Sequence, residues 1–104
     1  MHTKLADENM DNLFLAILSL KTKEECYRFF EDLCTISELK SMSQRLEVAL
    51  MLEKKCIYTD IAAKTGASTA TISRVNRCLH YGSDGYQTVI ARLQEAAEKE
   101  DCHE

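Results

Sequence analysis

The chain has 104 residues, which suits one small domain spanning residues 1–104, with a core that is only just sufficient unless a partner chain extends it. It contains no proline and only three glycines, which favours a mostly helical protein, and its net charge of −4 argues by itself against a nucleic-acid binder. No apolar run is long enough to span a membrane, and the first residues lack the layout of a signal peptide, so we expect a cytoplasmic protein.

Three helices are predicted in the first half of the chain. Apolar residues at helical spacing indicate a first helix from about residue 7 to residue 20. Thr22 followed by Glu25 has the form of a capping box, in which each side chain satisfies a backbone N–H at a helix start, so a second helix begins there. The segment "TISE", residues 35–38, repeats this form and opens a third helix that runs to about Lys55.

Three more helices are predicted in the second half. A short helix is expected from Thr59 to Thr65, followed by a tight turn at Gly66 and a hydroxyl-rich helix that ends near Leu79. The segment "HYGSDGY" breaks the pattern, and a final amphipathic helix begins at about Tyr86. The sequence therefore predicts an all-α protein of six helices.

The segment "YTDIAAKTGASTATISRVNRCL" fits a helix-turn-helix at about residues 59–79. Gly66 can adopt the positive φ that the turn needs at no steric cost. Ile72 and Val75 are three residues apart and are predicted to point inward against Ile61. The turn departs from the usual pattern because it lacks bulky apolar residues, so we expect the two helices to be loosely packed there, at Thr65 and Ala67.

The other side chains of this second helix then face outward, and Ser68 is placed to cap it. Short hydroxyls, a methyl group and arginines are poor core residues, but they suit the major groove of DNA. Arginine can form two hydrogen bonds to guanine, and threonine or alanine methyl groups can contact thymine. The predicted DNA-binding residues are Thr59, Lys64, Ser68, Thr69, Ala70, Thr71, Ser73, Arg74 and Arg77.

The charge is distributed unevenly along the chain. Residues 40–80 carry seven basic and three acidic side chains, a net charge of +4, whereas residues 1–39 and residues 81–104 each carry −4. Clustered positive charge around the helix-turn-helix is expected of a surface that contacts phosphates, and acidic flanks would weaken indiscriminate binding. The overall net charge of −4 is therefore compatible with DNA binding by residues 40–80.

At these residues the sequence resembles the tryptophan repressor family. "GASTATISRVNRCL" is similar to the turn and recognition helix of the repressor, and "VNRCLHYGSDGY" resembles its YerC/YecD-type relatives. The similarity covers roughly residues 35–93. It implies a six-helix fold and an intertwined homodimer, in which the N-terminal helices and the last helix of each chain pack against the partner. Two recognition helices would then enter successive major grooves of double-stranded DNA, which implies a palindromic operator.

The resemblance also implies a place for a small-molecule effector beside the recognition helix. Where the repressor contacts tryptophan, the chain keeps Thr35, Arg45 and Arg74, but it has Cys78 in place of a serine. It also has Val75 where the repressor has a glycine against the indole ring, so we do not expect tryptophan to be the effector. The two arginines could instead bind phosphate, pair with acidic neighbours or hold another small anion.

Two other classes of function compete with DNA binding. An enzyme is not expected, because no set of nucleophile, base and oxyanion donors is evident; His2 and His103 fall in the expected tails, and His80 is placed to cap the recognition helix or meet a phosphate. The remaining alternative is a protein-interaction or thiol-based redox-sensing module that uses Cys78.

The cysteines give no sign of a metal site. Their number, five, is odd, and none forms a CxxC pair, which argues against both a disulfide framework and structural zinc. Cys102 beside His103 is too little to form a metal site on its own. We therefore expect reduced thiols, no metal and no cofactor.

Overall fold

A computed structural model of the chain describes residues 7–102 and the side chains of residues 7–99. His2, His103 and the side chain of Cys102 lie outside this range. The described residues form helices and no strand, which confirms the all-α class and the predicted number and order of helices. The six helices are α1 (Glu8–Leu18), α2 (Lys23–Leu33), α3 (Ile36–Glu53), α4 (Tyr58–Thr65), α5 (Thr69–Tyr81) and α6 (Gly85–Cys102).

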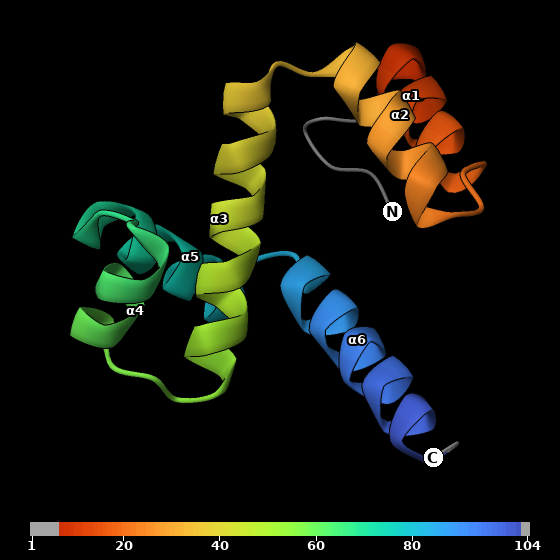
Figure 1. Ribbon diagram of the computed structural model, residues 1–104. Helices are drawn as coiled ribbons and strands as arrows, with labels where there is room; N and C mark the ends of the chain where they lie inside the picture. The colour runs from red at the N-terminus through yellow and green to blue at the C-terminus, as the bar shows by residue number, and fades with distance from the viewer. Residues whose placement is uncertain (1–6, 103–104) are drawn as a thin grey trace. The chain divides into compact units, whose positions relative to one another are not determined.

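The chain divides into two compact units, residues 1–39 and residues 40–104, and the boundary falls within α3 (Figure 1). We call them unit 1 and unit 2. The organisation as a single domain stays a prediction. No helix in the described part of the chain combines the length and the apolar character needed to cross a bilayer.

The N-termini of α1 and α2 are capped by side chains. The Asp7 carboxylate accepts a hydrogen bond from the Met10 N–H at 2.6 Å, and the Thr22 hydroxyl oxygen accepts one from the Glu25 N–H at 3.0 Å. The Glu25 carboxylate returns to the N–H of Lys21 at 2.8 Å, one residue before the cap. The predicted cap at Thr22 is therefore confirmed, with the reciprocal bond displaced by one residue.

The start of α3 is a complete capping box. The Thr35 hydroxyl oxygen accepts from the Glu38 N–H at 3.1 Å, and the Glu38 carboxylate accepts from the Thr35 N–H at 2.8 Å. The hydrogen bonds from the backbone and the hydroxyl of Thr35 stabilise the ionised carboxylate and lower the pKa of Glu38 below its ordinary value of 4.5. The box therefore satisfies two backbone groups and fixes the start of α3.

α3 ends at Glu53, earlier than the sequence indicated, in a Schellman motif. Lys55 adopts a left-handed conformation with φ of 68°, and its N–H donates to the Leu52 carbonyl oxygen at 3.0 Å. The Cys56 N–H donates to the Met51 carbonyl oxygen at 3.1 Å. A lysine takes the position where glycine is most common, so no residue type marks this helix end in the sequence.

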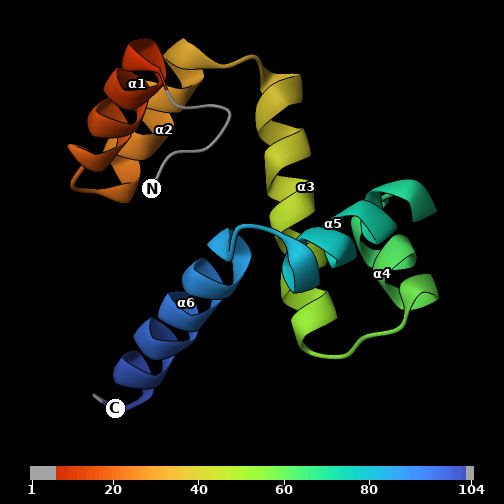
Figure 2. The same ribbon diagram turned by 180° about the vertical axis from the view of Figure 1, so that it is seen from behind.

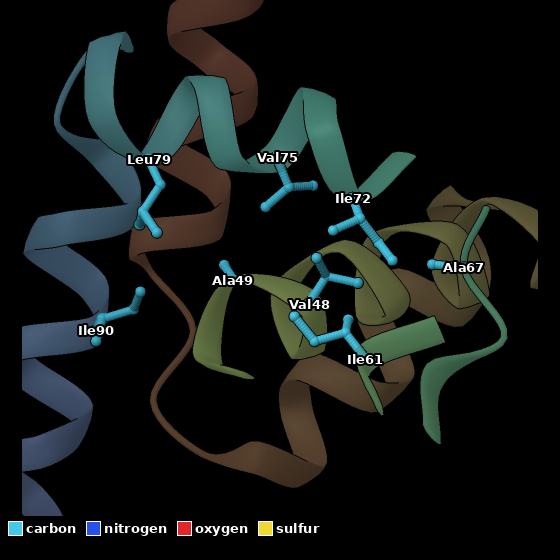
Figure 3. Packing of buried hydrophobic residues seen from close by; sticks show 8 residues of the cluster. All are labelled: Val48, Ala49, Ile61, Ala67, Ile72, Val75, Leu79 and Ile90. Carbon is cyan, nitrogen blue, oxygen red and sulfur yellow. The ribbon is translucent and has the colours of Figure 1, made fainter. Parts of the chain in front are cut away.

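Unit 2 has a core formed by four helices (Figure 3). Three residues of α5 point towards residues of α3 and α4, and one residue of α6 lies against the end of α5. Partly buried side chains, among them Ala62 and Tyr86, pack around this cluster. Its buried members are Val48, Ala49, Ile61, Ala67, Ile72, Val75, Leu79 and Ile90.

The described residues of unit 1, residues 7–39, form no comparable core. α1 and α2 lie side by side (Figures 1 and 2), and the rings of Phe29 and Phe30 meet edge to face at 5.6 Å. No side chain of either helix is buried. Leu15 and Leu18 of α1 are 64% and 79% exposed. Two helices of three turns each are too small to enclose an apolar interior, so the described residues of unit 1 leave these faces uncovered.

Gly82, which follows α5, and Gly85, the first residue of α6, should respond differently to the same substitution. A Cβ at Gly82 would lie 2.3 Å from the Cys78 carbonyl oxygen, whereas one at Gly85 would meet nothing within 4 Å. We expect Gly82→Ala to lower the free energy of unfolding by about 1–3 kcal/mol, because the backbone must shift. Gly85→Ala should change it by less than about 1 kcal/mol. Urea unfolding of both variants measures the difference, and equal effects would contradict the close contact at Gly82.

The capping box predicts a pH dependence at the start of α3. Because the pKa of Glu38 is lower in the folded protein than in the unfolded chain, its contribution to stability is complete above pH 4.5 and is lost as the pH falls through the folded-state pKa. An NMR titration of the Glu38 carboxyl carbon should give a midpoint below 4.5, and Thr35→Ala should raise that midpoint. A midpoint at or above 4.5 in the parent protein would contradict the hydrogen bonds.

Candidate nucleic-acid interface

The turn of the helix-turn-helix lies between α4 and α5 and is fixed by backbone and side-chain hydrogen bonds. Gly66 has φ of 75°, as the sequence predicted, and its N–H donates to the Ala62 carbonyl oxygen at 2.9 Å. The Thr65 hydroxyl donates to the Ile61 carbonyl oxygen at 2.7 Å and accepts from the Ala67 N–H at 3.1 Å. Ala67 is only 5% exposed. The two positions where we expected loose packing are therefore held by hydrogen bonds and burial.

Ser68 is the N-cap of α5, as predicted. Its hydroxyl oxygen accepts a hydrogen bond from the Thr71 N–H at 3.1 Å, and its own hydroxyl donates to the Thr71 hydroxyl oxygen at the same distance. The Ile72 N–H donates to the Ser68 carbonyl oxygen. These bonds use part of the hydrogen-bonding capacity of Thr71, whose side chain is half-buried. Thr71 is therefore less available to a ligand than the sequence suggested.

α5 has one buried face and one exposed face. Ile72, Val75 and Leu79 are at most 4% exposed, and they point into the core of unit 2 (Figure 3). Their spacing of three and four residues keeps them on one side of the helix. This confirms that Ile72 and Val75 are buried. The residues of the predicted interface that the structure exposes on α5 are Thr69, Ala70, Ser73, Arg74 and Arg77.

The exposed face of α5 is positively charged. The whole of α5 contains no acidic side chain, and its exposed face carries Arg74 and Arg77. The aligned peptide dipoles add partial positive charge at the helix N-terminus. Thr59 and Lys64, the two predicted residues on α4, are also exposed. Every basic residue that the sequence assigned to this interface is thus accessible to a phosphate backbone.

His80 does not cap the recognition helix. It lies in the last turn of α5, where its ring meets that of Tyr81 edge to face at 6.4 Å, and the terminal hydrogen bond instead joins the Gly82 N–H to the Cys78 carbonyl oxygen. The His80 side chain is exposed. Its contact with a phosphate stays a prediction.

The residues predicted to hold an effector do not all belong to one unit. Thr35 lies in unit 1, where its hydroxyl oxygen already accepts from the Glu38 N–H. Arg45, Arg74 and Cys78 lie in unit 2, and all three are exposed. Cys78 is a free thiol. An effector role for these residues stays a prediction, and so does a redox role for the thiol.

An open, mostly apolar groove of about 510 Å³ runs beside the end of α5. Cys78 of α5 lines it together with Leu46 of α3 and with Tyr86 and Val89 of α6, and the connection between α5 and α6 closes one side. Neither Arg45 nor Arg74 lines the groove. Among the described residues, no group of three or more histidine, cysteine or acidic side chains converges to hold a metal ion.

Two glutamines outside the predicted site contact the helix-turn-helix. The Gln44 side-chain N–H donates to the Thr65 carbonyl oxygen at 3.2 Å, and the Gln87 side-chain N–H donates to the Leu79 carbonyl oxygen at 3.0 Å. Gln44 is 21 residues from its acceptor along the chain. No spacing rule connects residues that far apart, so only the packed helices could reveal this contact.

Comparison with known proteins gives consistent matches across most of the chain. The profile of a family described as Trp repressor protein matches residues 8–94. The uncharacterized protein YerC of Bacillus subtilis strain 168 is 59% identical over 92 residues, which are 88% of this chain and 88% of YerC. These matches confirm the resemblance that the recognition-helix segment indicated.

Two solved structures share the fold. One is a candidate Trp repressor from Staphylococcus aureus, with 50% identity and a TM-score of 0.84 over 88% of this chain and 91% of the other. The second is a TrpR-like protein from Eubacterium eligens, with 62% identity and a TM-score of 0.85 over 88% of this chain and 94% of the other. Both sequence and fold therefore point to the same family.

Proposed function

The chain belongs to the Trp repressor family, a family of DNA-binding transcription regulators rather than of enzymes, and we propose that it is a sequence-specific, repressor-like regulator that binds double-stranded DNA as a homodimer. The observation that carries this proposal is the division of α5 into two faces. Ile72 and Val75 are buried, and Arg74 and Arg77 are exposed on the same helix.

The exposed face of α5 fits the major groove in shape and chemistry. Thr69, Ala70 and Ser73 are short, so the helix backbone can approach the base edges closely. Arg74 and Arg77 supply planar guanidinium groups that can form two hydrogen bonds to a guanine. Specificity would come from these side chains, while Thr59 and Lys64 of α4 would contact the phosphate backbone and set the register.

A second copy of the chain is the proposed cover for the apolar faces that unit 1 leaves exposed. Phe14, Leu15 and Leu18 of α1 are at least half exposed, and Val89 and Leu93 of α6 are 46% and 45% exposed. Apolar surface of this extent is costly to leave in water, and association of two identical chains removes it. This agrees with the intertwined dimer that the family resemblance implies.

A twofold axis would place the two copies of α5 in successive major grooves on the same face of the DNA. Successive major grooves on one face of B-DNA are about 34 Å apart, so each recognition helix would read one half-site of a palindrome or near-palindrome. We do not propose tryptophan as an effector, because Val75 carries a side chain where the family's ligand meets a glycine. Arg45 and Arg74 remain candidate contacts for a different small-molecule effector.

The proposed function predicts a selectable operator. Selection from a pool of random duplexes should enrich a palindromic or near-palindromic sequence. Arg74→Ala should then weaken binding by about 1–3 kcal/mol and relax specificity at one base pair per half-site. Lys64→Ala should weaken binding to all duplexes alike and reduce the slope of log K against log salt concentration by about 1 per chain.

Arg92→Ala is the matched control for these variants. Arg92 is an exposed arginine of α6 outside the helix-turn-helix. Its removal changes the net charge equally without altering a residue of the proposed DNA interface. It should alter neither the base preference nor the salt slope. Failure to enrich any sequence, with or without added metabolite extracts, would contradict the proposed function.

The proposed dimer predicts that a charge on α1 weakens self-association. Sedimentation equilibrium of the parent chain should give the mass of two chains. Leu18→Glu should raise the dissociation constant of the dimer by at least about 10-fold, because the carboxylate would be buried in an apolar interface. Asn12→Glu adds the same charge at an exposed polar position of α1 and serves as the control. A parent chain that is monomeric at high concentration would contradict the dimer.

A further inference from the structure

Two glutamine side chains from outside the helix-turn-helix reach the ends of its two helices. Gln44 of α3 donates to the carbonyl oxygen of Thr65, the last residue of α4, and Gln87 of α6 donates to that of Leu79, near the end of α5. In the described part of the chain, these are the side-chain hydrogen bonds that join α4 or α5 to another helix. Both acceptors belong to the last turn of a helix, where carbonyl groups have no partner within the helix.

Gln44 acts at the turn. Its amide nitrogen is 3.2 Å from the Thr65 carbonyl oxygen and would lie 4.0 Å from a Cβ placed on Gly66. The Thr65 side chain in turn donates to the Ile61 carbonyl oxygen and accepts from the Ala67 N–H. Thr65 therefore connects Gln44 to the segment that leads into the recognition helix, so a shift of Gln44 would displace that segment.

Gln87 acts at the other end of α5. Its amide nitrogen is 3.0 Å from the Leu79 carbonyl oxygen, and its own helix is held to the core by the buried Ile90. The next helix-end carbonyl, that of Cys78, is taken by the Gly82 N–H. The Gln87 bond therefore ties the C-terminal end of α5 directly to α6.

We propose that Gln44 and Gln87 are positioning residues that set the tilt and axial position of α5 against DNA. This inference rests on the proposed function. The buried ridge of α5 determines which face is hidden, but apolar contacts have no preferred direction and permit the helix to slide or tilt by small amounts. A hydrogen bond loses strength when its length or angle changes, so one bond at the turn before α5 and one near the C-terminal end of α5 fix the remaining freedom.

The positioning role predicts a loss of specific binding that exceeds any loss of general binding. Gln44→Met and Gln87→Met keep the length and flexibility of the side chain but remove the N–H donor. Each should weaken binding to the selected operator by about 3- to 10-fold, and the double variant by about the product of the two. Binding to a scrambled duplex at the same salt concentration should change by less than about 2-fold.

The ratio of the two affinities separates positioning from simple destabilisation. A variant that is partly unfolded has fewer competent molecules, which lowers both affinities by the same factor and leaves the ratio unchanged. A misplaced α5 lowers the ratio, because only base contacts need the correct tilt. All measurements are made at a temperature where circular dichroism shows every variant folded.

Gln94→Met is the matched control, because Gln94 is exposed on α6 and the substitution is identical. It should leave the ratio unchanged. The carbonyl ¹³C resonance of Thr65 should move in Gln44→Met, that of Leu79 should move in Gln87→Met, and neither should move in Gln94→Met. This readout detects the two hydrogen bonds without any DNA.

The outcomes distinguish the two proposals. If the parent chain selects no duplex, the proposed function fails. If the parent selects an operator but the glutamine variants keep its affinity ratio, or if the carbonyl resonances do not move, the positioning role is wrong and the proposed function stands.

Discussion

The burial of one ridge of α5, formed by Ile72, Val75 and Leu79, holds the core of unit 2 together. Each fully buried aliphatic side chain contributes about 1.5–3 kcal/mol, whereas a single hydrogen bond adds about 0.5–1.5 kcal/mol. The ridge therefore provides most of the attachment of α5 to α3 and α4. The hydrogen bonds of Ser68, Gln44 and Gln87 are weaker, and they orient α5 rather than hold it in place. Attachment and orientation thus come from different kinds of contact.

This division of roles explains why β-branched residues are acceptable in a helix at this place. Ile72 and Val75 lose χ1 freedom in a helix, but their burial more than offsets that loss. On the opposite side, Thr69 and Ser73 are short and polar, so their side chains extend only a small distance from the helix backbone. One face of the thirteen-residue helix α5 needs apolar side chains that can be buried, and the other needs short side chains. Branched residues suit the first face and small residues the second.

Local signals in the sequence predicted the local structure well. The cap at Ser68, the positive φ at Gly66 and the inward side chain of Ile72 each depend on neighbours within about one helical turn, and all three were correct. Lys55 was missed because a lysine rarely takes a left-handed conformation, so no residue-type signal marked the end of α3. Thr71 was expected to face outward, but it is half-buried and its hydroxyl oxygen accepts a hydrogen bond from the N-cap Ser68.

Contacts between distant parts of the chain were beyond the reach of periodicity. Gln44 and Gln87 looked like ordinary polar residues on amphipathic helices, and only the packing of α3 and α6 against the motif gives them acceptors. The lack of a core in unit 1 was also only partly visible. Regular spacing of apolar residues on α1 predicts an amphipathic face, but the spacing does not say whether that face is covered within the chain or by another one.

The open apolar face of α1 has a consequence for control in the cell. If a second copy supplies the missing cover, the DNA-binding species forms when two chains associate, and its amount follows mass action. At expression levels below the dissociation constant of the pair, occupancy of a promoter would rise with the square of the number of chains. A modest change in synthesis or turnover would then switch a target gene more sharply than it would for a regulator that binds a single site as a monomer, without an added ligand.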